Sequence, residues 1–167
     1  MGNCGDFSQN NQLETMIRGA TLINIDSKGR LAIPGRYREE LVERCDGRMV
    51  VTINNTSEHC LWLYPLDEWE KVEAKVVELS SYNPSHQKLK RFILGYASDL
   101  DMDKSGRILL PAVLRKFAKL DKSSYLVGQG NKFEIWDEAL WNEKCVQWLE
   151  TAAEEEVLSE ELERISL

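Results

Sequence analysis

The sequence IDSKGRLAIP at residues 25–34 returns 77 positions later as MDKSGRILLP at residues 102–111. Aspartate, glycine, arginine and proline occupy the same places in both stretches, and the apolar positions also correspond. Self-similarity at a fixed spacing is typical of a duplicated structural unit. Each copy has the pattern of a strand, a tight turn, a second strand and a short helix opened by the proline. We therefore expect two related repeats.

Further elements are expected to complete each copy. Apolar residues at helical spacing indicate one helix over residues 69–79 and another over residues 89–96. Between them, Asn83 is placed to cap a helix and Pro84 to occupy its first turn, so residues 80–85 are expected to form a hinge between the halves. The expected later strands are 48–53 and 60–64 in the first copy and 125–127 and 132–136 in the second.

The size of the repeats favours a shared fold. Neither repeat core is much longer than the roughly 40 residues below which a domain usually needs help to be stable. We expect an α+β fold in which the two copies interleave as a small β-barrel, with helices packed outside. The expected divisions are a disordered tail or cloning remnant (1–15), the first repeat with its helix (16–82), a linking helix with the second repeat and its helix (83–149), and an acidic tail (150–167).

Charge is distributed unevenly along the 167 residues, whose net charge is −7. Residues 150–167 hold seven glutamates and one arginine, so this segment carries most of the negative charge. In contrast, residues 18–38 and residues 103–119 each have five basic side chains and one acidic side chain. Two basic islands in an acidic chain indicate a surface for a negatively charged partner.

Composition also excludes several classes of protein. No uninterrupted apolar run approaches the roughly 20 residues of a membrane-spanning helix, and the N-terminus lacks the pattern of a secretory signal. The four cysteines are scattered without a Cys-x-x-Cys motif, which argues against a zinc ribbon or a disulfide framework. We expect a cytoplasmic protein without a membrane partner.

The duplicated stretch predicts a turn that presents an arginine. Asp26 and Asp103 can accept hydrogen bonds from backbone N–H groups two residues on, while Gly29 and Gly106 permit a positive φ. Such a turn fixes where the next side chain leaves the backbone. That side chain is an arginine in both copies, and its planar guanidinium matches phosphate oxygens or the edge of guanine. The candidate DNA contacts in the turns are Arg30, Lys28, Arg107 and Lys104.

The short helices add to this basic surface. Arg38 in the first copy and Arg115 in the second are expected to face outward from the apolar side of each helix. An alternative is that each aspartate and arginine merely close the turn by pairing, a contact worth about 0–1 kcal/mol when exposed. The repetition of the turn, with further cations on the following helix, favours a binding surface.

Three stretches resemble the MraZ family of bacterial transcriptional regulators, which are built from two tandem SpoVT-AbrB-type domains. These stretches are MIRGA at residues 16–20, residues 25–37, and VGQGNKFEIWD at residues 127–137. The resemblance spans most of the chain and places the natural start at Met16. It implies a swapped-hairpin β-barrel whose turns contact DNA. It also implies a ring of protomers that binds short direct repeats upstream of the cell-division and cell-wall gene cluster, usually as a repressor.

The resemblance also implies particular DNA contacts. By position, Arg30 and Arg107 correspond to the turn arginine of the family, and Arg38 and Arg115 to a further helix arginine. AbrB-like proteins place another basic residue on the strand before the turn, where this chain has Ile23 and Leu100.

Other chemistry finds little support in the sequence. His59 and His86 are far apart, and no catalytic or metal-binding spacing can be assembled around them. We therefore predict a non-enzymatic protein without metal or cofactor. The first hypothesis is a homo-oligomeric regulator that binds double-stranded DNA and associates with the nucleoid. The alternative is a non-enzymatic oligomeric scaffold whose basic islands dock acidic partners, including its own acidic tail.

Overall fold

The computed structural model describes residues 16–152 and residue 165. Its strands are β1 (Ala20–Asn24), β2 (Arg30–Ala32), β3 (Arg48–Ile53), β4 (Leu61–Pro65), β5 (Ser98–Asp101), β6 (Arg107–Leu109), β7 (Ser123–Gly128) and β8 (Phe133–Asp137). Its helices are α1 (Gly35–Cys45), α2 (Leu66–Val77), α3 (Pro84–Ile93), α4 (Ala112–Phe117) and α5 (Glu138–Ala152). This order confirms the predicted series of strand, turn, strand, short helix, two strands and longer helix in each copy.

The two copies exchange strands within one antiparallel sheet. The six strands of this sheet follow the order β1-β7-β8-β4-β3-β5, so each copy's first strand pairs with a strand of the other copy. The short strands β2 and β6, one from each copy, pair with each other as a separate ribbon. The predicted α+β class and the interleaving of the copies are therefore confirmed.

The described strands do not form the expected closed barrel. Among the described residues, β1 and β5 are the two ends of an open sheet and do not pair with each other. The difference arises because β2 and β6 pair together and pack over one face of the sheet instead of extending it. Their middle residues, Leu31 and Ile108, are almost completely buried in the main core.

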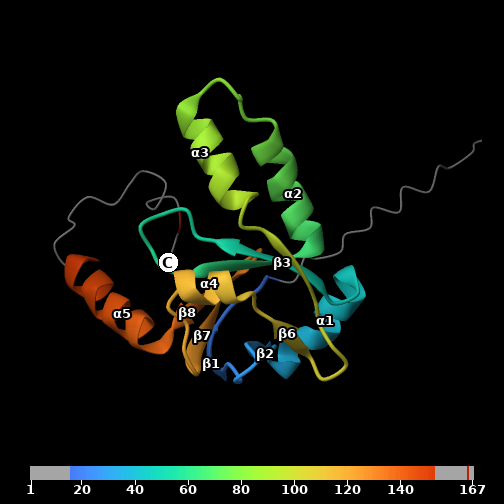
Figure 1. Ribbon diagram of the computed structural model, residues 1–167. Coiled ribbons are helices and arrows are strands. Elements are labelled where there is room, and N and C mark those ends of the chain that lie inside the picture. Colours follow the sequence, from blue (N-terminus) through green and yellow to red (C-terminus); the bar gives the residue numbers. More distant parts are fainter. Residues whose placement is uncertain (1–15, 153–164, 166–167) are drawn as a thin grey trace, which may run out of the picture.

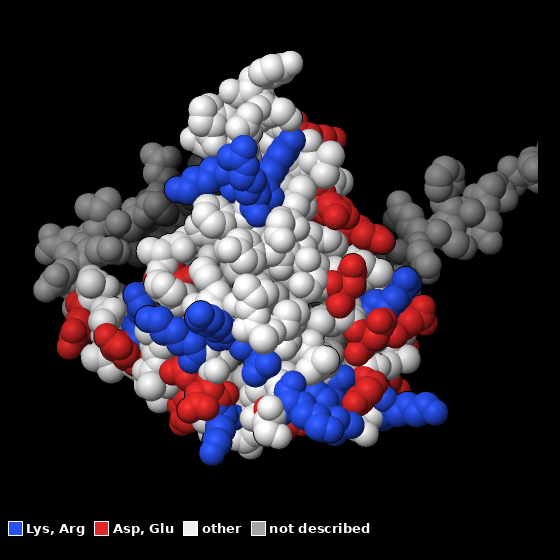
Figure 2. All heavy atoms as spheres, viewed as in Figure 1, with Lys and Arg blue, Asp and Glu red and all other residues white. Residues whose placement is uncertain are grey.

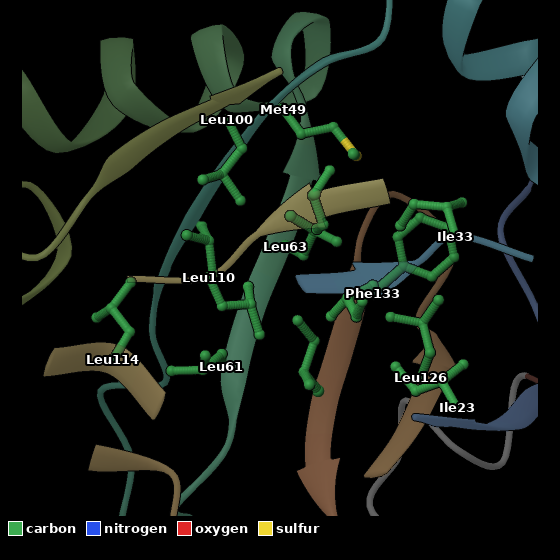
Figure 3. Packing of buried hydrophobic residues seen from close by; sticks show 14 of the residues in the cluster. Ile23, Ile33, Met49, Leu61, Leu63, Leu100, Leu110, Leu114, Leu126 and Phe133 are labelled. Carbon is green, nitrogen blue, oxygen red and sulfur yellow. The ribbon is translucent and has the colours of Figure 1, made fainter. Parts of the chain in front are cut away.

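One hydrophobic core serves both copies. It contains side chains from strands and short helices of both halves, and Figure 3 shows Ile33, Leu63, Leu110 and Phe133 converging on the same interior. Phe133 meets the ring of Tyr37 edge-on, with 5.0 Å between the ring centroids. Because Tyr37 belongs to the first copy and Phe133 to the second, neither half has a complete core of its own.

Strand β3 lies between two packing layers, which explains its apolar sequence RMVVTI. Met49, Val51 and Ile53 face the main core, whereas Val50 faces a second cluster that includes Trp69 of α2. A strand buried on both faces is typically a continuous run of apolar and β-branched residues. The second cluster is built largely from helices α2 and α3, which project together from the top of the molecule in Figure 1.

Residues 78–83 connect α2 to α3 in this helical hairpin, so the predicted hinge at residues 80–85 covers the end of the turn and the first two residues of α3. The side chain of Asn83 accepts hydrogen bonds from the backbone N–H groups of Ser85 (2.9 Å) and His86 (3.4 Å). The predicted cap and the Pro84 start of α3 are therefore confirmed. Since Val76 of α2 and Ile93 of α3 share one buried cluster, the two helices pack against each other on either side of the turn.

Helix α5 packs against strands β7 and β8 through aromatic contacts. Trp136, Trp141 and Trp148 pack with ring centroids 5.7–6.0 Å apart. None of the helices in the described ranges combines the length and apolar character of a membrane span. The expected tail at residues 1–15 lies outside the described residues, and so does the acidic segment 150–167 apart from the end of α5 and residue 165.

Candidate nucleic-acid interface

The β2–β6 ribbon brings the two predicted arginines onto one surface. In its register, Arg30 lies opposite Leu109, Leu31 opposite Ile108 and Ala32 opposite Arg107. Side chains alternate between the faces of a strand, so the burial of the central Leu31–Ile108 pair places the four flanking residues on the outer face. From strand geometry, the Cα atoms of Arg30 and Arg107 are about 8 Å apart.

Asp26 organises the first turn. Its Oδ1 accepts hydrogen bonds from the backbone N–H groups of Lys28 and Arg30, both at 2.9 Å, and its Oδ2 lies 2.8 Å from Arg30 Nε. A backbone hydrogen bond closes the turn, in which Gly29 N–H donates to the Asp26 carbonyl at 2.9 Å. Gly29 has φ +85°, a conformation that residues with a Cβ rarely adopt.

Asp103 organises the second turn in the same way. Its Oδ1 accepts from the backbone N–H groups of Ser105 (2.8 Å) and Arg107 (2.9 Å), and its Oδ2 lies 3.0 Å from Arg107 Nε. Gly106 has φ +74°. The lysine occupies a different position in each turn, because Lys28 directly precedes the turn glycine and Lys104 directly follows the turn aspartate. Both lysines are exposed. In both turns, therefore, the aspartate accepts two backbone hydrogen bonds and the glycine has a positive φ.

Each turn also contains the aspartate–arginine ion pair of the alternative interpretation. Within the described part of the chain, the polar contacts of each turn arginine side chain use Nε alone. The side chains of Arg30 and Arg107 are 31% and 37% exposed. Closing the turn through Nε therefore leaves the terminal nitrogens of each guanidinium available to a ligand, and the two interpretations are compatible.

The turn carboxylates predict a pH effect. The backbone N–H of the turn arginine lowers the pKa of Asp26 below its usual value, and the same contact lowers the pKa of Asp103. A carboxyl with a lowered folded-state pKa adds stability above its unfolded pKa, and this stability is lost as pH falls through the folded-state pKa. We expect the turns to lose stability below about pH 4.

This prediction can be measured as the change in the urea midpoint of unfolding between pH 7 and pH 3. The double variant Asp26→Asn with Asp103→Asn keeps the side-chain shape but cannot titrate at these positions. It should lose less stability on acidification than the wild-type protein. Equal losses would contradict the assignment of these two carboxylates.

Arg38 and Arg115 are placed differently from their expected outward orientation. Both side chains are half-buried. Arg38 Nε donates to the Ile33 carbonyl at 2.6 Å, and Arg115 Nε donates to the Leu110 carbonyl at 3.2 Å. Each guanidinium lies against the turn glycine of the opposite copy, an exchange that analysis of the sequence missed because no local pattern encodes it.

Figure 2 shows how the basic side chains are distributed on one face of the molecule. Lys and Arg side chains gather over the lower part, around α4 and toward the β2–β6 end, where acidic side chains lie among them. A separate basic group lies over α3. This group was not predicted from the sequence, although α3 has three basic residues in four positions, at Lys88, Lys90 and Arg91.

The cysteines and histidines show no reactive arrangement in the described residues. Burial raises the pKa of Cys60 to about 12 and also raises the pKa of Cys45, so both thiols stay protonated near neutral pH. His59 stacks on Phe117 with 5.8 Å between ring centroids. Across residues 16–152, no group of three or more His, Cys, Asp or Glu residues could hold a metal ion.

Comparison with known proteins identifies the family. The family model of the MraZ protein, described as antitoxin-like, matches twice, at residues 16–92 and 93–164. A protein of Pseudoalteromonas atlantica named "Transcriptional regulator MraZ" is 51% identical over 150 residues, covering 90% of this chain and 97% of the relative.

Two further relatives carry the same name. The Haemophilus influenzae protein is 47% identical over 152 residues and the Halorhodospira halophila protein is 46% identical over 153 residues. Each alignment covers 91% of this chain and 100% of the relative. With two consecutive matches to the family model and relatives aligned over nearly their whole length, this chain belongs to the MraZ family.

Proposed function

We propose that this protein is a sequence-specific DNA-binding transcriptional regulator and that the outer face of the β2–β6 ribbon is its DNA-contacting surface. The observation that carries the proposal is the position of Arg30 and Arg107, half-exposed on one face of a two-stranded ribbon. A two-stranded ribbon fits the major groove, where arginine can donate two hydrogen bonds to the O6 and N7 edge of guanine. The name of the relatives supports the same class of function.

Lys28 and Lys104 flank this face and would contact phosphates. Each half of the chain, residues 16–82 and residues 83–149, would contribute one turn to the surface. Phosphate contacts from a small basic surface alone give only non-specific dissociation constants of about 10⁻⁴–10⁻⁶ M at physiological salt. Tight and specific binding by this chain therefore needs several such surfaces acting together.

Assembly of protomers into a ring would supply that multivalency. Repeated turns that meet successive direct repeats in a promoter can raise the overall affinity by about 10²–10⁴-fold without a new kind of contact. The resemblance that the sequence shows to its family supports a promoter upstream of the cell-division and cell-wall gene cluster, and repression as the outcome. Such a regulator would act in the cytoplasm, on the nucleoid.

The test is fluorescence anisotropy with labelled duplexes that carry one, two or four direct repeats, each titrated at several salt concentrations. Affinity should rise steeply with the number of repeats and fall as salt increases, while a scrambled duplex of equal length should bind weakly. Equal affinity for single-repeat, multi-repeat and scrambled duplexes would contradict the proposal.

A scaffold that docks acidic proteins is the second candidate, and the basic group on α3 is the observation that favours it. Lys88, Lys90 and Arg91 lie on the helical hairpin, which projects away from the β2–β6 ribbon in Figure 1. Under this alternative, Arg91→Ala would weaken capture of an acidic peptide such as residues 150–164. DNA affinity would be negligible in the wild-type protein.

A further inference from the structure

We propose that Arg38 and Arg115 are positioning residues, each of which holds the DNA-facing turn of the opposite copy. The inference rests on the proposed function, because it assigns these residues a part in the same surface. It differs from a direct-contact role, since each arginine would act through a turn arginine: Arg115 through Arg30, and Arg38 through Arg107.

The first unit joins Arg115 of the second copy to the first turn. A Cβ built on Gly29 would lie 2.6 Å from Arg115 Cζ, 2.7 Å from Nε and 2.9 Å from one terminal nitrogen, so the guanidinium rests directly on this glycine. Leu110 links the two partners through its backbone. Its carbonyl accepts from Arg115 Nε at 3.2 Å, while its N–H donates to the Gly29 carbonyl at 3.0 Å.

The second unit repeats this arrangement with the copies exchanged. A Cβ built on Gly106 would clash with Arg38 Nε and would lie 2.6 Å from its Cζ. Ile33 provides the backbone link, since its carbonyl accepts from Arg38 Nε at 2.6 Å and its N–H donates to the Gly106 carbonyl at 2.8 Å. Each member of this unit lies 77 positions from its counterpart in the first unit.

The occurrence of the same contact in both copies argues against accidental packing. The same three-part link of arginine, backbone amide and turn glycine forms twice, between different segments of the chain. Two constraints exclude a side chain at each glycine. The backbone φ is positive, and the guanidinium occupies the space where a Cβ would lie. Lysine would fit poorly, because it lacks the planar group that lies over the glycine while Nε donates.

Hydrogen exchange of the backbone amides tests the inference without DNA. In Arg115→Ala, exchange should speed up at residues 28–30 by about fivefold, the factor that one ordinary hydrogen bond is worth, and should not change at residues 105–107. Arg38→Ala should give the reverse pattern. Lys116→Ala, an exposed neighbour on the same helix as Arg115, should change neither turn.

The effect must appear in the opposite copy for the proposal to stand. Faster exchange in both turns alike, in the turn of the same copy, or in neither turn would overturn it. If an alanine variant proves too unstable to study, Arg115→Lys keeps the charge and the aliphatic stem but removes the planar group. It should still loosen residues 28–30, and wild-type exchange at residues 28–30 in a folded Arg115→Lys protein would overturn the proposal.

DNA binding gives an independent readout. Arg115→Ala should weaken binding by about tenfold when Arg30 is present and much less in an Arg30→Ala background, because coupled residues act non-additively. In an Arg107→Ala background the full loss should remain. If Arg115→Ala lowered the affinity equally in the Arg30→Ala and Arg107→Ala backgrounds, the inference would be overturned and the proposed function would stand. If the wild-type protein did not bind DNA, only the proposed function would be overturned.

Discussion

Replacing Arg30 and Arg107 together by alanine is expected to weaken binding to a direct-repeat duplex by about 2–6 kcal/mol, roughly 30-fold to 10⁴-fold. The range follows from about 1–3 kcal/mol for each arginine that recognises a base with two hydrogen bonds. The two side chains share the outer face of one ribbon, so the double variant removes both from the same surface. Anisotropy at fixed salt measures the loss directly.

The fold should survive these substitutions. Each arginine makes an exposed ion pair with its turn aspartate, and such pairs contribute only about 0–1 kcal/mol. Arg91→Ala is the matched control, because it removes an exposed arginine from α3 rather than from the ribbon. If Arg91→Ala lost as much DNA affinity as the double variant, or more, the DNA-binding surface would lie on the helical hairpin instead of the ribbon.

Phe133→Ala is expected to lower the free energy of unfolding by about 3–5 kcal/mol, the usual cost of removing a large aromatic side chain from a core. Phe133 is completely buried, pairs with Leu63 across β4 and β8, and packs edge-on against Tyr37. The loss is a large part of the 5–15 kcal/mol that stabilises a typical domain. Urea unfolding followed by tryptophan fluorescence and by circular dichroism measures it.

The two probes also test whether both copies share one core. Because Phe133 and Tyr37 come from different halves, a single transition with coincident curves is expected in the wild type and in the variant. Leu149→Ala serves as control, since Leu149 is 75% exposed and its loss should change stability little. Two separate transitions, with only the later one shifted by Phe133→Ala, would show that the halves fold independently.

Local features of the fold could be predicted from the sequence because local chemistry determines them. The turn at Asp26 needs an acid, a glycine and an arginine within five positions, and the cap at Asn83 needs contacts only two and three residues away. The duplication was equally visible, since both turns repeat at one offset. Strand β3 followed from its run of apolar and β-branched residues.

Features that depend on distant segments were harder to predict. Whether the sheet closes depends on what β2 and β6 pair with, and these three-residue strands pair across 77 positions of chain. Helical periodicity predicts an outward surface for Arg38 and Arg115 because it gives only the side of the helix on which each residue lies. Nothing in that periodicity shows that a glycine of the other copy makes room for each guanidinium.

Photocrosslinking from position 109 tests the central proposal most directly. Leu109 is 55% exposed on the outer face of the ribbon, directly opposite Arg30. Replacing Leu109 with a photoreactive benzophenone amino acid should give an ultraviolet-dependent crosslink to a multi-repeat duplex and little crosslink to a scrambled one. The same group in place of Tyr82, which is 97% exposed in the α2–α3 turn, should give none. Crosslinking from position 82 but not from position 109 would contradict the assignment of the ribbon as the DNA-contacting surface.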